Sequence, residues 1–380
     1  MHILIASANG YGNVGDDLAT LAVGKFLKNQ LKSPTIRYTR PPMQKELINW
    51  ADVVVIGAGG LFFDTLPDNV ENYLSYLRAA KRQRKLTMVM GIGTQGIVTE
   101  SAKAAYRDVL NRTDLITVRH QNDADVLQSI GVTKPIHVLA DPVFSLHKTR
   151  APYPKKAPRR KRPILAVSLA NTRQRPEVMA KLDPELRAQW QSLADKTDAN
   201  MAELVKKYRV RLVLQSEDDR EQYQIWADKY NLRILGAHDK TNKPHASQSI
   251  LDHYREVDFV LTSRFHGFIL ALIAKRPVFA LGFEGTKIHL TVQTQVPALH
   301  TYFMTSEAFI ADDQATLTTC ANKLQNFHTS QVEIGEQVAH VARTAREHET
   351  LIAQLLRKTK SRFKLVQSRI MRMQPIDIIN

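Results

Sequence analysis

The chain has 380 residues, more than one hydrophobic core usually organises, so two domains are the natural expectation. Its hydrophobic fraction of 43% and aromatic fraction of 7% are globular values and exclude a disordered protein. A formal net charge of +16 favours acidic partners, namely nucleic acid, anionic lipid or phosphorylated metabolites. The single cysteine, Cys320, excludes an intramolecular disulfide and fits a reducing compartment.

The start of the chain and its apolar runs bear on where the protein works. No apolar stretch is long enough to cross a bilayer. Residues Met1–Ala6 form a short apolar run without a basic lead, which predicts a first strand rather than a signal peptide. We therefore expect a cytoplasmic protein.

Residues 1–150 alternate short apolar runs with helical patterns, an order typical of a parallel sheet covered by helices. The expected strands are Ile3–Ala6, Val53–Ile56, Thr87–Gly91, Leu115–Val118 and His137–Leu139. The expected helices are Asp17–Gln30, Val70–Lys81, Glu100–Asn111 and Asn122–Ser129. This segment is predicted to be an N-terminal Rossmann-like domain.

Residues 151–163 interrupt the alternation with prolines and cations, and we predict a basic linker there. The alternation restarts over residues 164–330, which predicts a second Rossmann-like domain facing the first across a cleft. Its expected strands are Ile164–Leu169, Val210–Leu214, Arg233–Leu235, Phe259–Leu261 and Val278–Ala280. Its expected helices are Met201–Tyr208, Arg220–Lys229, His245–Tyr254, Phe268–Ala274 and Ala315–Asn326.

Residues 331–380 are predicted to be terminal helices with a basic tail. Between Arg357 and Arg372 the chain carries cations and no acidic residue. A solvated helix face explains this pattern, and the interleaved apolar residues also fit peripheral contact with an anionic membrane surface. Nucleic acid is not expected as a partner, because the chain has no recognition motif and no clear stacking platform.

The most informative segment lies in the second domain. The apolar strand Phe259–Leu261 is followed closely by Ser263, Arg264 and His266, and then by a helical pattern from Phe268. In open α/β sheets ligands bind at the carboxyl ends of strands, and helix N-termini there favour anions. The segment therefore couples an anion site to a group that can donate a proton near neutral pH.

Three glycine-rich loops are expected at strand ends of the first domain, within Ser7–Asp17, Gly57–Leu61 and Gly91–Gly96. Glycine permits close approach of backbone to a ligand, so the loops predict one wall of the cleft. The first loop lacks dinucleotide-binding spacing, and Asp16 and Asp17 would repel a pyrophosphate. The acidic pair instead suits helix capping and hydrogen bonds to sugar hydroxyls.

Further charged residues follow other strands. Arg119 is suited to clamp a carboxylate or phosphate, and a surface salt bridge to Asp123 or Asp125 is the competing expectation. Asp141 at another strand end would orient a cation or cap a turn. If the domains face each other, five cationic or titratable residues converge on one crevice: Arg264, His266, Lys287, Arg173 and Arg119. Such a cluster suits a small, doubly charged anion.

The sequence shows no motif for metal binding, for a phosphate-binding P-loop or for a catalytic nucleophile. The 13 histidines show no persuasive metal-ligand spacing, so no metal site is expected. There is no phosphate-binding P-loop and no nucleophile elbow.

Taken in order, these motifs resemble the polysaccharide pyruvyl transferase family. The resemblance covers roughly residues 1–287 and leaves the C-terminal tail uncovered. It rests on Gly12–Asp17, Gly57–Gly60, Gly91–Gly93, Val118–Arg119, Asp141–Pro142, Ser263–His266 and Lys287.

The resemblance implies a GT-B-like pair of Rossmann-like domains, the first on the acceptor side and the second on the donor side. It implies transfer of pyruvate from phosphoenolpyruvate to hydroxyls of a sugar, with release of phosphate and no cofactor, and a lipid-linked sugar is one form that the acceptor could take. His266 would be the general acid, and Arg264 would hold the anionic donor. The candidate substrate-binding residues are Arg119, Lys287, Arg173, Ser263, Asn13, Asp16, Gly15, Gly59, Gly60 and Asp141.

Two other functions remain open from the sequence. A GT-B glycosyltransferase would use the same cations to neutralise the diphosphate of a nucleotide sugar. A non-catalytic basic protein would bind a membrane surface through its tail. The pyruvyl transferase hypothesis also carries a difficulty, because Arg264 beside His266 disfavours a protonated imidazole until an anionic donor binds.

Overall fold

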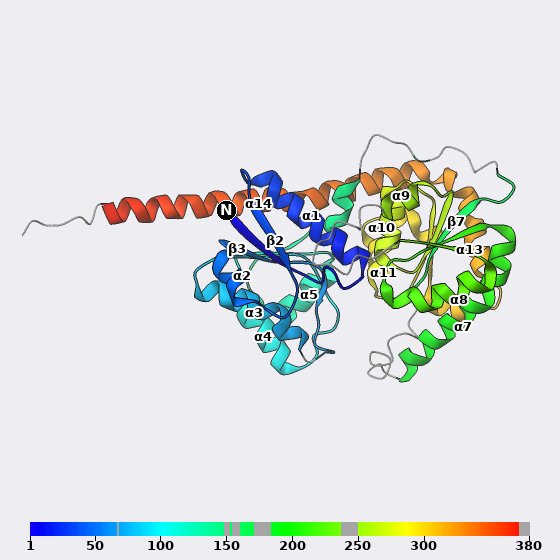
Figure 1. Cartoon of the computed structure of the whole chain (residues 1–380), viewed down its shortest axis with the longest axis horizontal. Coiled ribbons are helices and arrows are strands. Elements are labelled where there is room, and N and C mark those ends of the chain that lie inside the picture. The colour runs from blue at the N-terminus through cyan, green and yellow to red at the C-terminus, as the bar shows by residue number, and fades with distance from the viewer. Residues whose placement is uncertain (67, 148–152, 154–159, 171–183, 237–249, 372–380) are drawn as a thin grey trace, which may run out of the picture.

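The computed structural model describes residues 1–66, 68–147, 153, 160–170, 184–236 and 250–371, with side chains described as far as residue 359. The chain folds into two α/β domains, and a long C-terminal helix runs along both of them (Figure 1). Each domain is built on a six-stranded sheet in which every strand pair is parallel. The predicted class, α/β with two Rossmann-like domains, is confirmed.

The first sheet has the strand order β2-β1-β3-β4-β5-β6. Its strands are β1 (His2–Ala6), β2 (Thr35–Thr39), β3 (Val53–Phe62), β4 (Leu86–Thr94), β5 (Leu115–Val118) and β6 (Ile136–Val138). Its helices are α1 (Val14–Gln30), α2 (Lys45–Trp50), α3 (Asn69–Arg82), α4 (Glu100–Leu110), α5 (Gln121–Ser129) and the 3₁₀ helix η1 (Pro142–Leu146).

The second sheet has the order β12-β11-β10-β7-β8-β9. Its strands are β7 (Ile164–Ser168), β8 (Arg209–Val213), β9 (Arg233–Leu235), β10 (Phe259–Thr262), β11 (Val278–Gly282) and β12 (Phe303–Thr305). Its α-helices are α7 (Pro184–Lys207), α8 (Arg220–Tyr230), α9 (Ile250–Arg255), α10 (Phe265–Ile273), α11 (Lys287–Thr294), α12 (Ser306–Ala311) and α13 (Leu317–Lys323), and its 3₁₀ helices are η2 (Glu217–Asp219), η4 (Pro297–Tyr302) and η5 (Leu324–Thr329).

The strand order reverses once in each sheet, and this reversal locates the ligand-binding edge. In the first sheet the chain moves outward in opposite directions from β1, to β2 on one side and β3 on the other. In the second sheet the reversal falls between β7 and β10. Ligands of open α/β sheets bind at the carboxyl ends of strands beside such a reversal. The loops after β1 and β10 therefore occupy the two favoured positions.

Alternating side chains of the first sheet pack into two separate hydrophobic cores, one on each face. Ile3 and Ile5 of β1 join a core that includes α1 and continues into the second domain. Leu4 and Ala6 pack on the opposite face, in a core with residues of α2 to α5. Successive side chains of a strand point to opposite faces, so a sheet covered on both sides needs apolar residues throughout. The core shared by both domains fixes how their strand ends meet.

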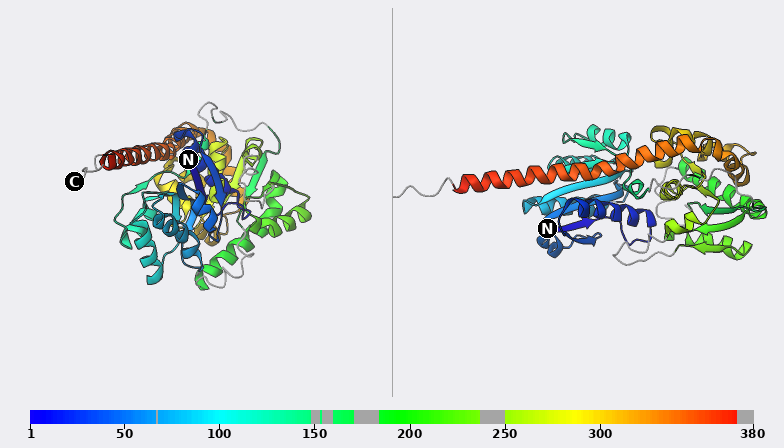
Figure 2. Two further views of the ribbon diagram at one scale, coloured as in Figure 1. Left: turned by 60° about the vertical axis from the view of Figure 1, so that its left-hand side comes forward. Right: turned by 90° about the horizontal axis from the view of Figure 1, so that it is seen from above.

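The C-terminal helix α14 (Gln331–Met371) joins the domains a second time. Its first turns bury Ile334 and Val338 in the shared core, and further along it buries His348 and Ile352. There α14 lies against α1 and η1 of the first domain. Figures 1 and 2 show the helix continuing beyond that domain.

The buried His348 makes stability depend on pH. Burial lowers the pKa of its ring from 6.5 to about 4, although the Ala140 carbonyl and Asp141 oppose the shift. Between these values the folded state binds fewer protons than the unfolded state. We expect stability to be full above pH 6.5 and to fall by on the order of 3 kcal/mol through this one group as the pH drops through about 4.

Urea unfolding of the wild-type protein and of His348→Gln, at neutral pH and at about pH 4, measures this loss. The glutamine variant has no ring to titrate, so its free energy of unfolding should fall less over the same interval. Equal losses in the two proteins would show that His348 does not carry the effect.

Several sequence-based expectations are wrong in detail. The predicted glycine loops Gly57–Leu61 and Gly91–Gly96 lie mostly within strands, because β3 runs to Phe62 and β4 to Thr94. A Cβ on Gly57 would lie 2.7 Å from the carbonyl oxygen of Met90, so these glycines allow close strand approach rather than a loop. The expected helix at Phe268 begins at Phe265.

Other elements were not predicted or lie partly outside the described residues. Strand β2, helix α2, helix α11, strand β12 and helix α12 had no counterpart in the prediction. Most of the predicted linker at residues 151–163, and the first part of the expected helix His245–Tyr254, lie outside the described residues. Within the described part of the chain, no helix combines the length and apolar character needed to cross a membrane.

Candidate active site

The carboxyl end of β10 and the first turn of α10 place Arg264 and His266. Arg264 is the N-cap residue, and the His266 side chain, in the first turn, is only 11% exposed. Thr262 fixes the entry to the helix, because its hydroxyl accepts from the Arg264 N–H at 3.0 Å and donates to the Ser168 carbonyl at 2.8 Å. The N-terminus of this nine-residue helix points its free N–H groups at the same place.

The start of α1 brings the first domain directly onto His266. The Asn13 side chain caps α1 by accepting from the Gly15 N–H at 3.0 Å. A Cβ on Gly15 would lie 1.8 Å from Nδ1 of His266. Backbone hydrogen bonds from Val14 to the Gln215 carbonyl and from Glu217 to the Gly12 carbonyl, both 2.9 Å, hold the two domains together at this point.

Gly15→Ala is therefore expected to displace the His266 ring. No rotation of the alanine methyl relieves a 1.8 Å approach, so the ring or the domain contact must shift. Misplacement of a reacting group by about 1 Å can cost on the order of 10²-fold in rate. Turnover of Gly15→Ala should fall by about that factor, measured beside Gly335→Ala, where the nearest neighbours of the new Cβ lie at a comfortable 3.6 Å. Wild-type turnover in Gly15→Ala would contradict the contact.

A buried ion pair lies behind His266. Arg119 Nη1 donates to Asp141 Oδ2 at 3.0 Å, and both side chains are 1% exposed. The partner of Arg119 is thus Asp141 and not Asp123 or Asp125. Asp141 Oδ2 is also 3.7 Å from Nε2 of His266, too long for a hydrogen bond but close enough for a strong charge interaction.

The neighbours of Asp141 keep its carboxyl ionised. Burial alone would raise the pKa of the Asp141 carboxyl, but the neighbouring His266 ring and Arg119 guanidinium outweigh it and hold that pKa well below its usual range. Asp141 also accepts from the Val143 N–H at 2.9 Å. A buried carboxylate therefore lies beside the His266 ring.

Arg119 retains unused hydrogen-bonding capacity. Its Nε and Nη2 atoms are buried and meet no acceptor among the described residues. A Cβ on Gly93 would lie 2.2 Å from Nη2, so the glycine makes room for the guanidinium. Phe265 covers the guanidinium with its ring centroid 5.5 Å from Cζ. Buried donors without an acceptor are costly, so these atoms are suited to an incoming oxyanion.

Asp16 and Lys287 complete the junction from opposite domains. A Cβ on Gly59 would lie 2.9 Å from Asp16 Oδ1, and one on Gly60 would lie 2.7 Å from Lys287 Nζ. Burial raises the pKa of Asp16, although His266 and Lys287 counteract it. Burial, together with repulsion from Arg119, lowers the pKa of Lys287 to about 8, so its ammonium remains mostly charged at neutral pH. Asp16 is thus a carboxylate that takes up a proton more readily than usual.

Arg264 is held by the carboxylate of Asp219, which was not among the predicted site residues. Its Nε donates to Asp219 Oδ2 at 2.9 Å, and its Nη2 donates to Asp219 Oδ1. The Asp219 carboxylate is fully buried, whereas the Arg264 side chain is 25% exposed. Ser263 is a structural neighbour, since its Oγ accepts from the Ala170 N–H at 2.8 Å.

The structure therefore brings most of the predicted site residues to one domain junction. Among the described residues, three basic side chains at the junction each lie near a carboxylate. The pairs are Arg119 with Asp141, Arg264 with Asp219, and Lys287 with Asp16. Arg173 lies outside the described residues. Gln95, which accepts from Lys287 Nζ at 3.1 Å, had no distinguishing signal in the sequence.

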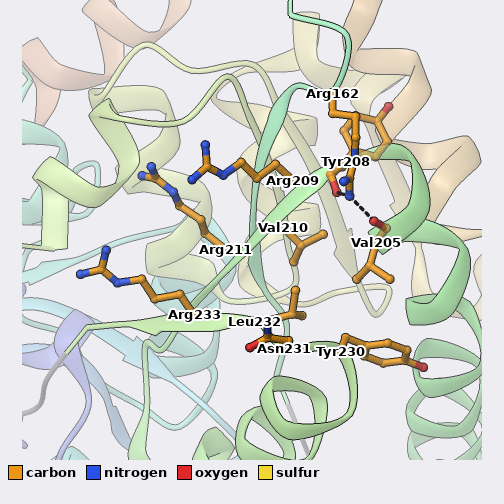
Figure 3. A pocket seen from close by; sticks show the side chains of 10 residues that line it. All are labelled: Arg162, Val205, Tyr208, Arg209, Val210, Arg211, Tyr230, Asn231, Leu232 and Arg233. Atoms are coloured by element: carbon orange, nitrogen blue, oxygen red, sulfur yellow. Dashed lines mark hydrogen bonds between the residues drawn. The ribbon is translucent and has the colours of Figure 1, made fainter.

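A cavity of about 410 Å³ is lined partly by arginines and includes none of the candidate site residues (Figure 3). Arg209 and Arg233 begin β8 and β9, at the amino ends of strands whose carboxyl ends approach the junction. Arg211 pairs with Glu256 at 3.2 Å, and Arg162 donates to backbone carbonyls of Val205 and Tyr208. This cavity is therefore not part of the candidate site. Among the described residues, no group of three or more metal-ligating side chains is arranged to hold an ion.

Two parallel-sheet domains that meet at the carboxyl ends of their strands define a GT-B-like α/β protein, and the junction carries a histidine among cations and carboxylates. The sequence profile of the polysaccharide pyruvyl transferase family matches residues 13–284, and the chain belongs to this family. Membership supports a transferase that modifies polysaccharide. The match includes Arg264 and His266 and ends before Lys287.

HepE of Anabaena in complex with UDP aligns with a TM-score of 0.52 and 10% identity over 95% of this chain and 99% of that one. At this identity the alignment shows a shared fold alone. The UDP-GlcNAc 2-epimerase of Methanocaldococcus jannaschii aligns with a TM-score of 0.47 and 10% identity over 90% of this chain and 98% of that one. Among curated proteins, none matches the chain.

Proposed function

We propose that the protein transfers a pyruvyl group from phosphoenolpyruvate to hydroxyls of a sugar in a cell-surface polysaccharide or its precursor, with release of phosphate. The observation that carries the proposal is the placement of His266 at the N-terminus of α10, 3.7 Å from the ionised Asp141. This placement puts a titratable ring between a carboxylate and cations that are suited to bind anions. Family membership agrees with this activity.

In this proposal the basic side chains at the domain junction bind the donor, phosphoenolpyruvate. Phosphoenolpyruvate carries a carboxylate and a phosphate on one small molecule, so it needs more than one cationic contact. The unpartnered Nε and Nη2 of Arg119 and the ammonium of Lys287 are suited to these groups. Arg264 already donates two hydrogen bonds to Asp219, and it contributes N–H groups outside that pair and its charge at the helix N-terminus.

His266 is the general acid in this proposal. The Asp141 carboxylate lies 3.7 Å from Nε2, and its negative charge acts against that of the neighbouring Arg264 guanidinium. The ring gives its proton to C3 of the enol, and an electron-poor centre forms at C2. A general acid of this kind typically contributes on the order of 10² to 10⁴ in rate.

Asp16 is the general base for the acceptor. Its carboxyl lies at the start of α1, on the acceptor side, and its raised pKa suits the removal of a proton from a sugar hydroxyl. The hydroxyl oxygen bonds to C2 as its proton passes to Asp16. The bond from C2 to the phosphate oxygen then breaks, and phosphate leaves with the proton held by Asp16. A second sugar hydroxyl bonds to C2 and gives its proton to His266, which restores both residues. The products are a pyruvyl ketal and inorganic phosphate.

We also propose that α14 keeps the enzyme near an anionic membrane surface, where a lipid-linked acceptor would be found. Arg357 and Lys358 are exposed on the helix, which continues beyond the first domain (Figure 2). Cosedimentation with vesicles that contain anionic lipid, compared with neutral vesicles, tests this contact. Equal recovery with both would contradict it.

The donor is tested by supplying phosphoenolpyruvate, or a panel of UDP-sugars, together with a panel of glycan acceptors. Phosphate release from phosphoenolpyruvate, with a matching mass gain in the glycan, supports the proposal. Release of nucleoside diphosphate would instead establish glycosyl transfer, for which a GT-B-like fold is equally suitable.

A further inference from the structure

His348 of α14 lies directly behind the charged groups of the candidate site. It is fully buried, and its ring stacks on Phe26 of α1 at a centroid distance of 5.4 Å. Nδ1 is 3.1 Å from the Thr117 hydroxyl, and Nε2 is 3.3 Å from the Ala140 carbonyl oxygen. Nothing in the sequence distinguishes this histidine, which lies in a helical pattern outside the family match.

The partners of His348 determine which ring nitrogen carries the proton. A backbone carbonyl can only accept, so Nε2 must donate to Ala140. A neutral imidazole then offers Nδ1 as an acceptor, and the Thr117 hydroxyl donates to it. Thr117 Oγ1 in turn accepts from the Gly91 N–H at 2.7 Å. The result is one directed chain from the Gly91 N–H through Thr117 and His348 to the Ala140 carbonyl.

This chain passes through residues that lie next to both members of the buried ion pair. Ala140 is the residue before Asp141, and Thr117 is two residues before Arg119 on the strand β5. The Arg119–Asp141 distance of 3.0 Å and the Asp141–His266 distance of 3.7 Å therefore depend on the backbone positions that His348 bridges. The bridge comes from a helix that starts in the second domain, which also supplies His266.

We infer that His348 is a positioning residue, which sets the separation of the β5 end from the Asp141 turn and thereby places Asp141 against His266. The effect on turnover rests on the proposed function, whereas the effect on geometry does not. A ring that only filled space would be replaceable by an apolar side chain of similar size. A ring that positions the pair needs a donor and an acceptor at its two ends.

Three variants separate these roles. His348→Leu fills the site but offers neither hydrogen bond, whereas His348→Gln offers an amide N–H to Ala140 and a carbonyl to Thr117. His147→Leu is the matched control, because His147 is also buried, at 3% exposure, and follows Asp141 by six residues, but its Nδ1 has no partner among the described residues.

The first measurement is the ¹⁵N chemical shift of the His266 ring, taken at one fixed pH in the full chain. It responds to the distance and charge of Asp141 whether or not the protein turns over phosphoenolpyruvate. We expect His348→Leu to move the signal, and His348→Gln and His147→Leu to leave it near the wild-type position. An unmoved signal in His348→Leu, or an equal movement in His147→Leu, overturns the inference.

The second measurement is phosphate release from phosphoenolpyruvate with a glycan acceptor. His348→Leu should lower kcat by on the order of 10²-fold with little change in KM, and His348→Gln should restore most of it. A rise in KM alone, or no rescue by glutamine, contradicts a positioning role. If His348→Leu does not fold, Thr117→Val interrupts the same chain from β5 and should give the same ring signal change. Absence of turnover in the wild-type protein would refute the proposed function, and the ring signal would still decide the role of His348.

Discussion

His266→Ala should reduce phosphate release from phosphoenolpyruvate by at least about 10²-fold while leaving the thermal unfolding midpoint nearly unchanged. The variant loses the proton donor to C3, a contribution typically on the order of 10² to 10⁴ in rate. Its stability should survive because Nε2 of His266 makes no hydrogen bond within the described part of the chain. Steady-state phosphate release and a thermal unfolding curve on the same preparation provide both quantities.

His300→Ala is the matched control, since His300 is exposed on η4. It should retain both turnover and stability. A large loss of stability in His266→Ala would assign His266 to the packing of the domain junction. Retained turnover in a stable His266→Ala protein would remove it from the reaction.

Asp141→Asn should lower the free energy of unfolding by about 3–5 kcal/mol, because it leaves the Arg119 guanidinium buried without its counter-charge. Both partners are 1% exposed, so water cannot compensate. The loss should arise at neutral pH, where the Asp141 carboxyl is ionised. Urea unfolding monitored by circular dichroism measures the difference directly.

An exposed pair offers the comparison. Asp252 contacts Arg255 at 2.7 Å, but its side chain is 64% exposed. Asp252→Asn should cost no more than about 1 kcal/mol, as surface ion pairs usually do. If Asp141→Asn proves as mild as Asp252→Asn, the pair with Arg119 does not organise the site.

The part of the site at the start of α10 could be predicted from neighbouring residues in the sequence. An apolar strand followed at once by Ser263, Arg264 and His266 and then by an apolar helical pattern can be recognised within a dozen residues. The structure places Arg264 at the N-cap and His266 in the first turn of α10. Helix α10 begins three residues before the expected start at Phe268, because an N-terminal turn with polar residues carries little hydrophobic periodicity.

The partners of these residues could not be predicted, because they are tertiary contacts. Arg264 meets Asp219, 45 positions away, and Arg119 meets Asp141, 22 positions away. Many carboxylates in the sequence were equally eligible for either arginine. The residues around His348 in the sequence do not indicate its contacts, because these form only where α14 packs against the first domain.

The glycine segments were predicted to be loops from a rule that usually holds, but they lie mostly within strands. Glycine usually weakens a strand, so Gly57–Gly60 was predicted to be a loop. In the structure β3 continues through it, because Gly57 and Gly59 still pair with Met90 and Ile92 of β4. Leu61 and Phe62, which are buried after the glycines, were the available signal that the strand continues.

The most direct test of the account is a ³¹P NMR time course with phosphoenolpyruvate and glycan acceptors, run on the wild-type protein and on His266→Ala. We expect the phosphoenolpyruvate signal to decay into inorganic phosphate only when an acceptor is present, and only with the wild-type protein. Conversion by His266→Ala at the wild-type rate would contradict the role of His266. No conversion with any acceptor, together with release of a nucleoside diphosphate from a UDP-sugar, would contradict pyruvyl transfer itself.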